Sequence, residues 1–358
     1  ATVSLPQDAT IAALYRALAD RLPHAACDLS LVLDDKFDTR TSLEAAGLCN
    51  GSTVRVVLRA SCRVLSTSTD GTARLWNAET GKCILCLIGH GGEVNSVAVS
   101  PCKTYAVTSS DDCTAGVWDL KTGVRQLTLK GHTNEVWYST FSPDGGIIVT
   151  ASRDGTAKLW SFASGCCILT CVGHRSSVRS IAFSQDGTRM VTASSDATAK
   201  IWEINTGSVF QTIPVEDSAI SATFLEGEGG QCVAIALEAG LVQIWNLEFC
   251  ICQLVVQGRS VAASPDGNAL LTTLADVAIM WDVRCGKRTL TFEGHSDVVR
   301  CAAFSEDGLY AVTASNDGTV RVWNCDSGEC LRTLSGHRGD VLWAAFFGPG
   351  GLQKLPSA

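Results

Sequence analysis

The chain has 358 residues and a net charge of −8, with 46% apolar and 18% charged residues. This composition excludes a disordered chain, because it can bury a large core, and the acidic balance disfavours nucleic acid as the main partner. No apolar run reaches the length of a membrane span, and the first ten residues lack the basic and apolar regions of a secretory signal.

The 17 cysteines are an odd number and are scattered over the whole chain. A disulfide scaffold would be a short chain with densely spaced cysteines. We therefore expect free thiols in a reducing compartment, which is the cytoplasm, with the nucleus as the alternative.

Residues 1–60 predict a small α+β domain. TVSLP predicts a strand, and the apolar residues of IAALYRALADRL follow a helical stripe. DLSLVLDD and NGSTVRVVLR predict two further strands, on either side of the short helical turn TSLEAAGL. This order resembles the ubiquitin-like (β-grasp) fold from its second strand onward, without the usual first strand. Arg59-Ala60-Ser61 leads directly into the next domain, which excludes a conjugated modifier.

From residue 61 onward one pattern recurs about every 42 residues. Its markers are Trp76, Trp118, Trp160, Trp202, Trp245, Trp281 and Trp323. Within one period, residues 131–172, the apolar runs VWYSTFS, IIVTAS, TAKLW and CCILTCV are separated by SPDG, RDG and SFASG. Short β-prone runs between Gly, Asp and Pro turns predict four strands per period and exclude helical repeats.

Gly-His pairs, SPDG-like turns, DGT-like turns and the Trp six residues later resemble the WD-repeat family. The resemblance covers about residues 61–350 and implies a mainly β fold, a seven-bladed β-propeller, followed by a tail at residues 351–358. It also implies a hydrogen-bond relay of His, Ser, Asp and Trp inside each regular blade. The sets are His90/Ser110/Asp112/Trp118, His132/Ser152/Asp154/Trp160, His174/Ser194/Asp196/Trp202, His295/Ser315/Asp317/Trp323 and, from the two ends of the domain, His337/Ser68/Asp70/Trp76.

Histidine, serine and aspartate together also suggest a hydrolase triad. Five copies that recur with the period of the fold favour a structural network, because a buried imidazole needs one donor and one acceptor. We therefore expect no catalytic residue in these sets.

One blade must combine both ends of the domain. Residues 62–88 supply three of its strands, and VLWAAFF at 341–347 matches the first strands of the other blades. A rival closure uses STVRVVLRA at 52–60, which fits that pattern poorly. Closure by the C-terminal strand is favoured, because it leaves no free edge.

Two blades depart from the pattern. The Trp245 blade has ALEAG where DGT is expected, and the Trp281 blade has a shortened connection through Gln257-Gly258-Arg259-Ser260. We expect these two blades to be less tightly cross-braced.

The resemblance places the turns before first strands and after second strands on one face, around the central channel. Trp and Arg there predict an interface, because they anchor interfaces most often, and an acidic or aromatic peptide is the expected ligand. The alternative for Trp137 is packing between blades. The expected partner-binding residues are Trp137, Arg153, Arg179, Arg300, Asn95 and Leu342, with Glu93, Glu135 and Asp340 setting charge selectivity.

No phosphate-loop, dinucleotide, zinc-protease or nucleophile-elbow motif occurs in the sequence. We expect no metal and no cofactor, and the CxxC at Cys83 and Cys86 would point its thiols to opposite faces of a strand. The predicted function is a non-enzymatic protein-interaction scaffold, a monomer or a subunit of a complex. The alternatives are a ribosome-assembly factor and a substrate receptor of a ubiquitin ligase.

Overall fold

The computed structural model describes residues 62–227 and 230–347. The predicted ubiquitin-like domain at residues 1–60, the rival closing strand at 52–60 and the tail at 351–358 lie outside these residues.

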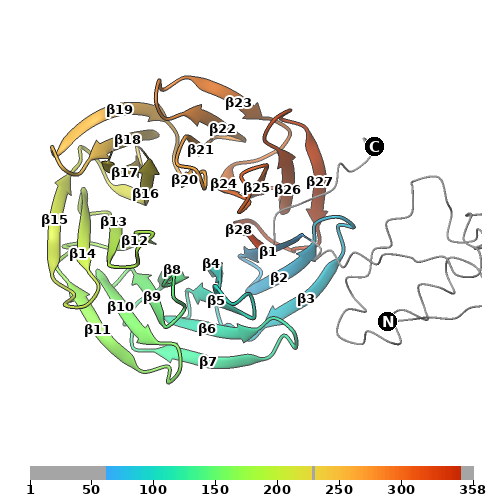
Figure 1. Ribbon diagram of the computed structural model, residues 1–358. Helices are drawn as coiled ribbons and strands as arrows, with labels where there is room; N and C mark the ends of the chain where they lie inside the picture. Colours follow the sequence, from blue (N-terminus) through green and yellow to red (C-terminus); the bar gives the residue numbers. More distant parts are fainter. Residues whose placement is uncertain (1–61, 228–229, 348–358) are drawn as a thin grey trace, which may run out of the picture. The chain divides into compact units, whose positions relative to one another are not determined.

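The described residues form seven four-stranded antiparallel sheets, the blades of a propeller. In each blade the first strand lies nearest the centre of the ring and the fourth lies at its outer edge (Figure 1). Blade 1 contains β4 (Val94–Val99), β5 (Tyr105–Ser110), β6 (Thr114–Asp119) and β7 (Arg125–Lys130); blade 2 contains β8 (Val136–Phe141), β9 (Ile147–Ser152), β10 (Thr156–Ser161) and β11 (Cys167–Val172); blade 3 contains β12 (Val178–Phe183), β13 (Arg189–Ser194), β14 (Thr198–Glu203) and β15 (Val209–Pro214).

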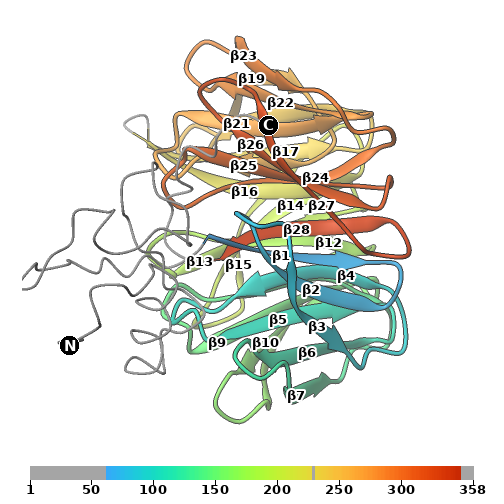
Figure 2. The ribbon, with the colours of Figure 1, turned by 90° about the vertical axis from the view of Figure 1, so that its right-hand side faces the viewer.

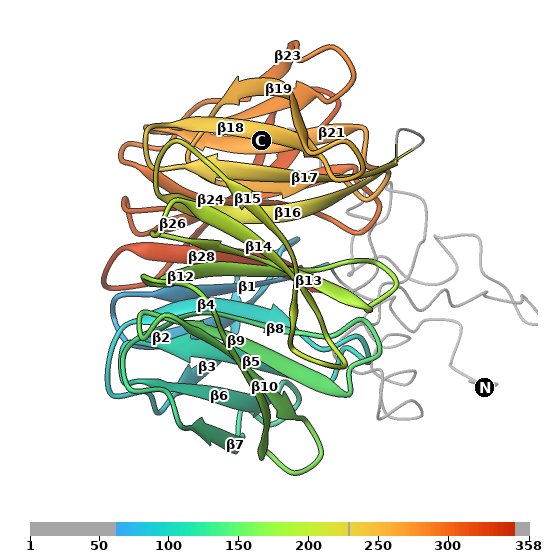
Figure 3. The same cartoon turned by 90° about the vertical axis from the view of Figure 1, so that its left-hand side faces the viewer.

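The second half of the ring continues in chain order and ends on a blade made from both ends of the domain. Blade 4 contains β16 (Ala219–Gly227), β17 (Gly230–Leu237), β18 (Leu241–Asn246) and β19 (Ile251–Gln257); blade 5 contains β20 (Val261–Ala263), β21 (Ala269–Leu274), β22 (Val277–Asp282) and β23 (Arg288–Phe292); blade 6 contains β24 (Val299–Phe304), β25 (Tyr310–Ser315), β26 (Thr319–Asn324) and β27 (Cys330–Ser335); blade 7 contains β28 (Val341–Phe347), β1 (Arg63–Ser68), β2 (Thr72–Asn77) and β3 (Cys83–Ile88). Figure 3 shows blades 2, 3 and 4 following one another around the ring.

The hydrophobic core lies between blades rather than within one sheet. One cluster combines Val64 and Trp76 of blade 7 with Val312 and Val320 of blade 6. In the third strands of blades 7 and 2, buried and half-buried residues alternate as far as a buried tryptophan at the next-to-last position, so both faces of these sheets pack on neighbours. Five tryptophans that belong to the regular repeats are almost fully buried: Trp76, Trp118, Trp160, Trp202 and Trp323.

Blade 7 closes the ring by pairing the C-terminal strand with the first strand of the domain. β28 runs antiparallel to β1, with Arg63 opposite Phe347 and Val64 opposite Phe346, and Figure 2 shows the two strands side by side. Lys103 of blade 1 also forms an ion pair with Glu306 of blade 6, the two blades that flank blade 7. The closure is thus the one that the sequence favours.

Blades 4 and 5 are irregular. The first strand of blade 5 has only three residues, whereas the first strand of blade 4 has nine. Trp245 and Trp281 are half-buried, unlike the third-strand tryptophans of the other blades.

A chain that ends at Asp340 lacks β28 and leaves the full length of β1 as an unpaired edge. Because exposed edges lose protection and promote association, we expect those amides of Val64–Thr67 that face β28 to exchange rapidly and the protein to aggregate. Hydrogen exchange and size-exclusion chromatography measure both effects. A chain that ends at Phe347 is the control, and equal protection of β1 in the two chains would contradict closure by β28.

Candidate interaction face and the networks that support it

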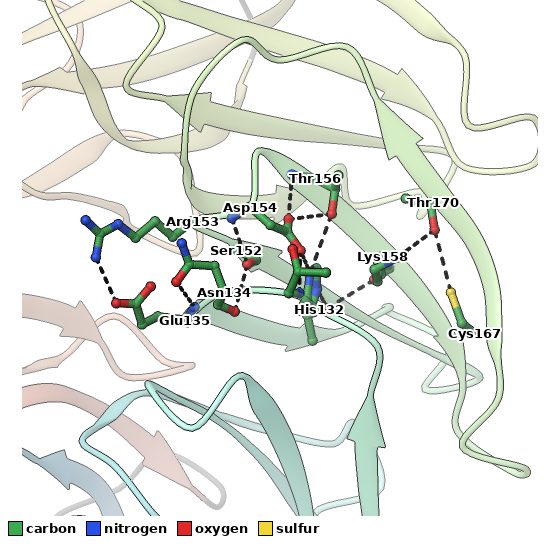
Figure 4. A network of polar contacts seen from close by, with 12 residues as sticks. His132, Asn134, Glu135, Ser152, Arg153, Asp154, Thr156, Lys158, Cys167 and Thr170 are labelled. Atoms are coloured by element: carbon green, nitrogen blue, oxygen red, sulfur yellow. Dashed lines mark hydrogen bonds and ion pairs between the residues drawn. The ribbon is translucent and has the colours of Figure 1, made fainter.

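Each of the five Gly-His histidines joins the start of its blade to the third strand. In blade 2 the His132 Nδ1–H donates to Asp154 Oδ2 (2.7 Å), and the Thr150 hydroxyl donates to His132 Nε2 (2.7 Å). The Trp160 Nε1–H donates to the same threonine oxygen (2.8 Å). Figure 4 shows His132 beside Asp154 and Thr156. The four groups form one continuous chain of hydrogen bonds through the blade.

The predicted relay contained a serine, and this part of the prediction was wrong. The hydroxyl that joins His to Trp lies two residues earlier, in the middle of the second strand. These residues are Thr108, Thr150, Thr192, Thr313 and, in blade 7, Ser66. All five recur with the same period as the predicted serines, so the repeat pattern alone could have identified them as candidates for the relay.

The predicted serines bind the turn instead, because they stand at the end of the second strand. The Asp154 amide donates to Ser152 Oγ (3.0 Å), and the Ser152 hydroxyl donates to the Asn134 carbonyl (3.1 Å). The same amide contact recurs in the other four regular blades, at Ser68, Ser110, Ser194 and Ser315.

Each aspartate accepts four hydrogen bonds, which explains the recurring threonine of the DGT turn. Asp154 Oδ1 accepts from the Thr156 amide and hydroxyl, and Oδ2 accepts from His132 and the Thr133 amide. Burial alone would raise the pKa of such a carboxyl, but the hydrogen bonds outweigh it. They lower the pKa to about 2 in Asp70, Asp112, Asp196 and Asp317.

The histidines are buried and hold a defined tautomer. A carboxylate only accepts and an indole N–H only donates, so Nδ1 carries the proton and Nε2 accepts from the hydroxyl. Burial lowers the pKa of His90, His174, His295 and His337, more strongly than their aspartate partners raise it. Each of the five imidazole side chains is at most 1% exposed. Such a ring has no access to a substrate.

Blades 4 and 5 keep only fragments of this network. Trp281 Nε1–H donates to Thr272 Oγ1 (2.8 Å), whose hydroxyl donates to the Gln257 carbonyl (2.8 Å) in place of a histidine. Trp245 Nε1–H donates to the Gln243 side chain (3.0 Å) in its own strand.

The side chains around the channel opening are presented by a repeated β-bulge. In the first strand of every blade except blade 5, the second residue is skipped by the ladder, as Trp137 is between Val136 and Tyr138. A bulge re-aims the extra side chain. We call the resulting ring of residues, with the turn residues beside them, the mouth; its bulge residues are Asn95, Trp137, Arg179, Ile220, Arg300 and Leu342.

A recurring backbone hydrogen bond places one turn residue of each of these blades beside the bulged strand, and this turn residue is therefore part of the mouth. The residue after the second strand donates its amide to the residue just before the bulged strand, as Arg153 does to Glu135 (2.9 Å). The same bond pairs Asp111 with Glu93 and Thr69 with Asp340. Most of the predicted partner-binding residues therefore lie at equivalent positions around one opening.

Trp137 and Arg179, from adjacent blades, form one unit. The Arg179 guanidinium lies 4.3 Å from the centre of a Trp137 ring, a cation–π contact. Its Nε–H donates to Ser195 Oγ (2.9 Å). Both side chains are half-buried, so part of each faces solvent.

The other predicted partner-binding residues differ in their exposure and in their hydrogen bonds. Arg300 is exposed, and its Nε–H donates to Asn316 Oδ1 (2.8 Å). Asn95 is occupied, because its amide donates to Asp111 Oδ1 (2.8 Å) and to the Val136 carbonyl (2.9 Å). Leu342 is half-buried.

Arg153 and Glu135 form an ion pair at the mouth (2.8 Å). Arg259 and Glu238 form a second pair (2.7 Å) that the repeat pattern did not predict. Arg259 takes the mouth position of blade 5: it precedes Ser260, which bonds Thr273 as Ser96 bonds Ser109 in blade 1. The repeat spacing did not reveal this equivalence, because the connection into blade 5 is shorter than in the other blades.

Acidic groups gather on the arc of blades 7 and 1. Burial, together with repulsion from Asp111 and Asp340, raises the pKa of Glu93. The three carboxylates are therefore close enough to interact.

An aromatic pair lines a cavity among the first strands of the blades. Tyr138 and Trp343 meet edge to face with their centroids 5.1 Å apart, and they line a cavity of about 320 Å³ with small side chains such as Ala222 and Ala302. In the residues for which side chains are described, no group of three or more His, Cys, Asp or Glu could hold a metal ion. Cys83 and Cys86 both lie exposed on β3.

Four segments of the chain match the model of the WD domain, G-beta repeat: residues 81–119, 123–161, 165–203 and 286–324. This chain contains WD repeats. Each match covers the fourth strand of one blade and the first three strands of the next, and those three strands belong to blades 1, 2, 3 and 6, whose networks are regular. Of the irregular blades, blade 5 contributes only β23 to a match and blade 4 contributes nothing.

Related proteins share parts of this repeat region. The chain is 32% identical over 77 residues to THO complex subunit 6 of Arabidopsis thaliana, covering 21% of each chain. It is 27% identical over 179 residues to nuclear distribution protein PAC1 of Coccidioides posadasii, covering 40% of this chain and 38% of that protein. It is 44% identical over 69 residues to human WD repeat and SOCS box-containing protein 1, covering 19% of this chain and 16% of that protein. The matches thus span well under half of each relative.

Replacing Thr150 by valine keeps its shape but removes the hydroxyl that joins His132 to Trp160. Two buried polar groups then lose their partner, so we expect a loss of about 1–3 kcal/mol in the free energy of unfolding. Urea denaturation measures it. Thr212→Val, at an exposed outer-strand position, is the control and should change stability little; equal effects of the two substitutions would contradict the assignment.

The lowered pKa values predict that stability falls in acid. Unfolded histidines take up protons below about pH 6.5, the unperturbed value, whereas the folded ones resist protonation, so falling pH favours unfolding. The aspartates add a further loss as pH falls from about 4 towards 2. Urea midpoints at constant ionic strength should therefore be lower at pH 5 than at pH 8, and a midpoint that stayed constant or rose would count against buried neutral histidines.

Proposed function

We propose that this protein is a non-enzymatic interaction scaffold that captures protein or peptide partners at the mouth. The observation that carries the proposal is the Trp137–Arg179 unit, in which an aromatic ring and a guanidinium are held 4.3 Å apart at a partly exposed position. Trp and Arg dominate the binding energy of interfaces when they are fixed in place. A propeller built on WD repeats is consistent with this role.

The mouth is suited to binding because its side chains start from a rigid support. The bulges of six blades aim one residue each at the channel opening, and in the regular blades the turns beside them are tied to the buried histidine networks. Such preorganisation lowers the entropic cost of association.

No helix in the described segments is long and apolar enough to cross a membrane. Cys83 and Cys167 are exposed free thiols on outer strands. Exposed thiols persist in reducing surroundings, which supports the cytoplasm, or the nucleus, as the compartment that we propose.

A second candidate is a substrate receptor of a ubiquitin ligase. It is favoured by the likeness to WD repeat and SOCS box-containing protein 1, whose zebrafish form is 44% identical over 69 residues. Co-purification of ligase subunits with the full chain would support this reading. A ribosome-assembly factor stays the third alternative, and co-sedimentation with pre-ribosomes tests it.

The double substitution Trp137→Ala/Arg179→Ala should remove partner capture while leaving the fold intact. In affinity purification with quantitative mass spectrometry, we expect its main partners to fall at least about tenfold, as for loss of a hot spot of 2 kcal/mol or more. The matched control Phe249→Ala/Arg284→Ala likewise removes one aromatic side chain and one arginine, from exposed positions elsewhere on the propeller. If both double variants kept the partners of the unchanged chain, the mouth would not be the binding site.

A further inference from the structure

The arginines of the mouth are of two kinds. Arg153 and Arg259 each lie in an ion pair with a glutamate, Glu135 and Glu238. Arg179 and Arg300 have no ion-pair partner among residues 62–227 and 230–347, and each is held through Nε by an uncharged oxygen, Ser195 Oγ and Asn316 Oδ1. Their positive charges are therefore uncompensated at contact distance.

Anchoring through Nε has a geometric consequence. A guanidinium has five N–H groups in a planar fork, and the Nε contact leaves its two terminal nitrogens side by side. That pair matches the two oxygens of a carboxylate or phosphate. In Arg179 the plane is fixed further by Trp137, so the fork is set before a ligand arrives.

The rest of the mouth restricts where an anion can lie. Arg179 stands in blade 3 and Arg300 in blade 6, three blades apart on a closed seven-blade ring. Blades 7 and 1 carry Asp340, Glu93 and Asp111. Like charges repel, and complementary arrangement across an interface sets register, so an anionic group is attracted to the arginine arc and repelled from the arc of blades 7 and 1.

We propose that the partner segment is a peptide with anionic side chains, carboxylate or phosphate, that bind the terminal nitrogens of Arg179 and Arg300, while its neutral or basic residues face blades 7 and 1. This inference rests on the proposed function and specifies the chemistry of its ligand. Ser195 and Asn316 are positioning residues, because each acts through the arginine that it orients.

The test uses the full chain and an immobilised library of peptides with a fixed central residue and random flanks. The central residue is phosphoserine, aspartate, glutamate, serine or lysine, so the library separates phosphate from carboxylate as the anion. We expect enrichment of an anionic central residue, with basic residues enriched on one side only. Arg179→Lys keeps the charge but removes the fork, and it should lower the enrichment about tenfold, the loss of one bidentate charge-assisted contact.

Arg284→Lys is the matched control, since Arg284 is an exposed arginine outside the mouth, and it should change the enrichment less than twofold. Ser195→Ala should give an intermediate loss, with an unchanged melting temperature that shows an intact fold. Enrichment of lysine, no selection by the unchanged chain, or anion selection that survives Arg179→Lys would each overturn the inference. Those results leave the proposed function standing as long as partner capture depends on Trp137, and capture that is independent of Trp137 would overturn the function itself.

Discussion

The hydrogen bond from a buried histidine to the aspartate of a β-turn is the interaction on which the rest of this propeller depends. It ties the segment that enters each regular blade to the turn before its third strand. The two residues are 22 positions apart in blades 1, 2, 3 and 6, and in blade 7 they come from the two ends of the domain. The aspartate also accepts a hydrogen bond from the threonine of the same β-turn, which holds the turn in place. On its other side, the histidine is linked to the core tryptophan through a shared hydroxyl group. Because such networks are fully satisfied, they rigidify the structure around them.

The residues that support the propeller and the residues that we propose bind partners lie in different places. The histidines are enclosed within the blades, whereas the turns that they hold in place carry the residues of the mouth. Blades 4 and 5, which lack the full network, nevertheless contribute the Arg259–Glu238 pair. Two ion pairs and two arginines without an ion-pair partner in the described residues make the mouth chemically uneven, although the fold beneath it repeats. We propose that these differences between the mouth residues, rather than the features common to all repeats, determine which partner binds.

The period of the sequence, with the resemblance to the WD-repeat family that it carries, was sufficient to predict the seven blades and the pairing of each histidine with its aspartate. It was insufficient to choose between Thr150 and Ser152, because both recur with the same period and only the register of the strand decides which hydroxyl reaches Trp160. Arg259 was missed because a shortened connection breaks the alignment that the Gly-His pairs provide. The pairing of Arg153 with Glu135, and its absence for Arg179, depend on side-chain conformations that no repeat pattern encodes.

Our central claim is that the recurrent histidines are structural and not catalytic. The protonation state of their imidazole rings tests this claim most directly. Long-range ¹H–¹⁵N spectra of the imidazoles at neutral pH distinguish the two neutral tautomers from the imidazolium. The account predicts that His90, His174, His295 and His337 are neutral, with a slowly exchanging proton on Nδ1 that is donated to aspartate. Rings that carry the proton on Nε2, or that titrate freely with solvent near pH 6.5, the unperturbed value, would contradict it.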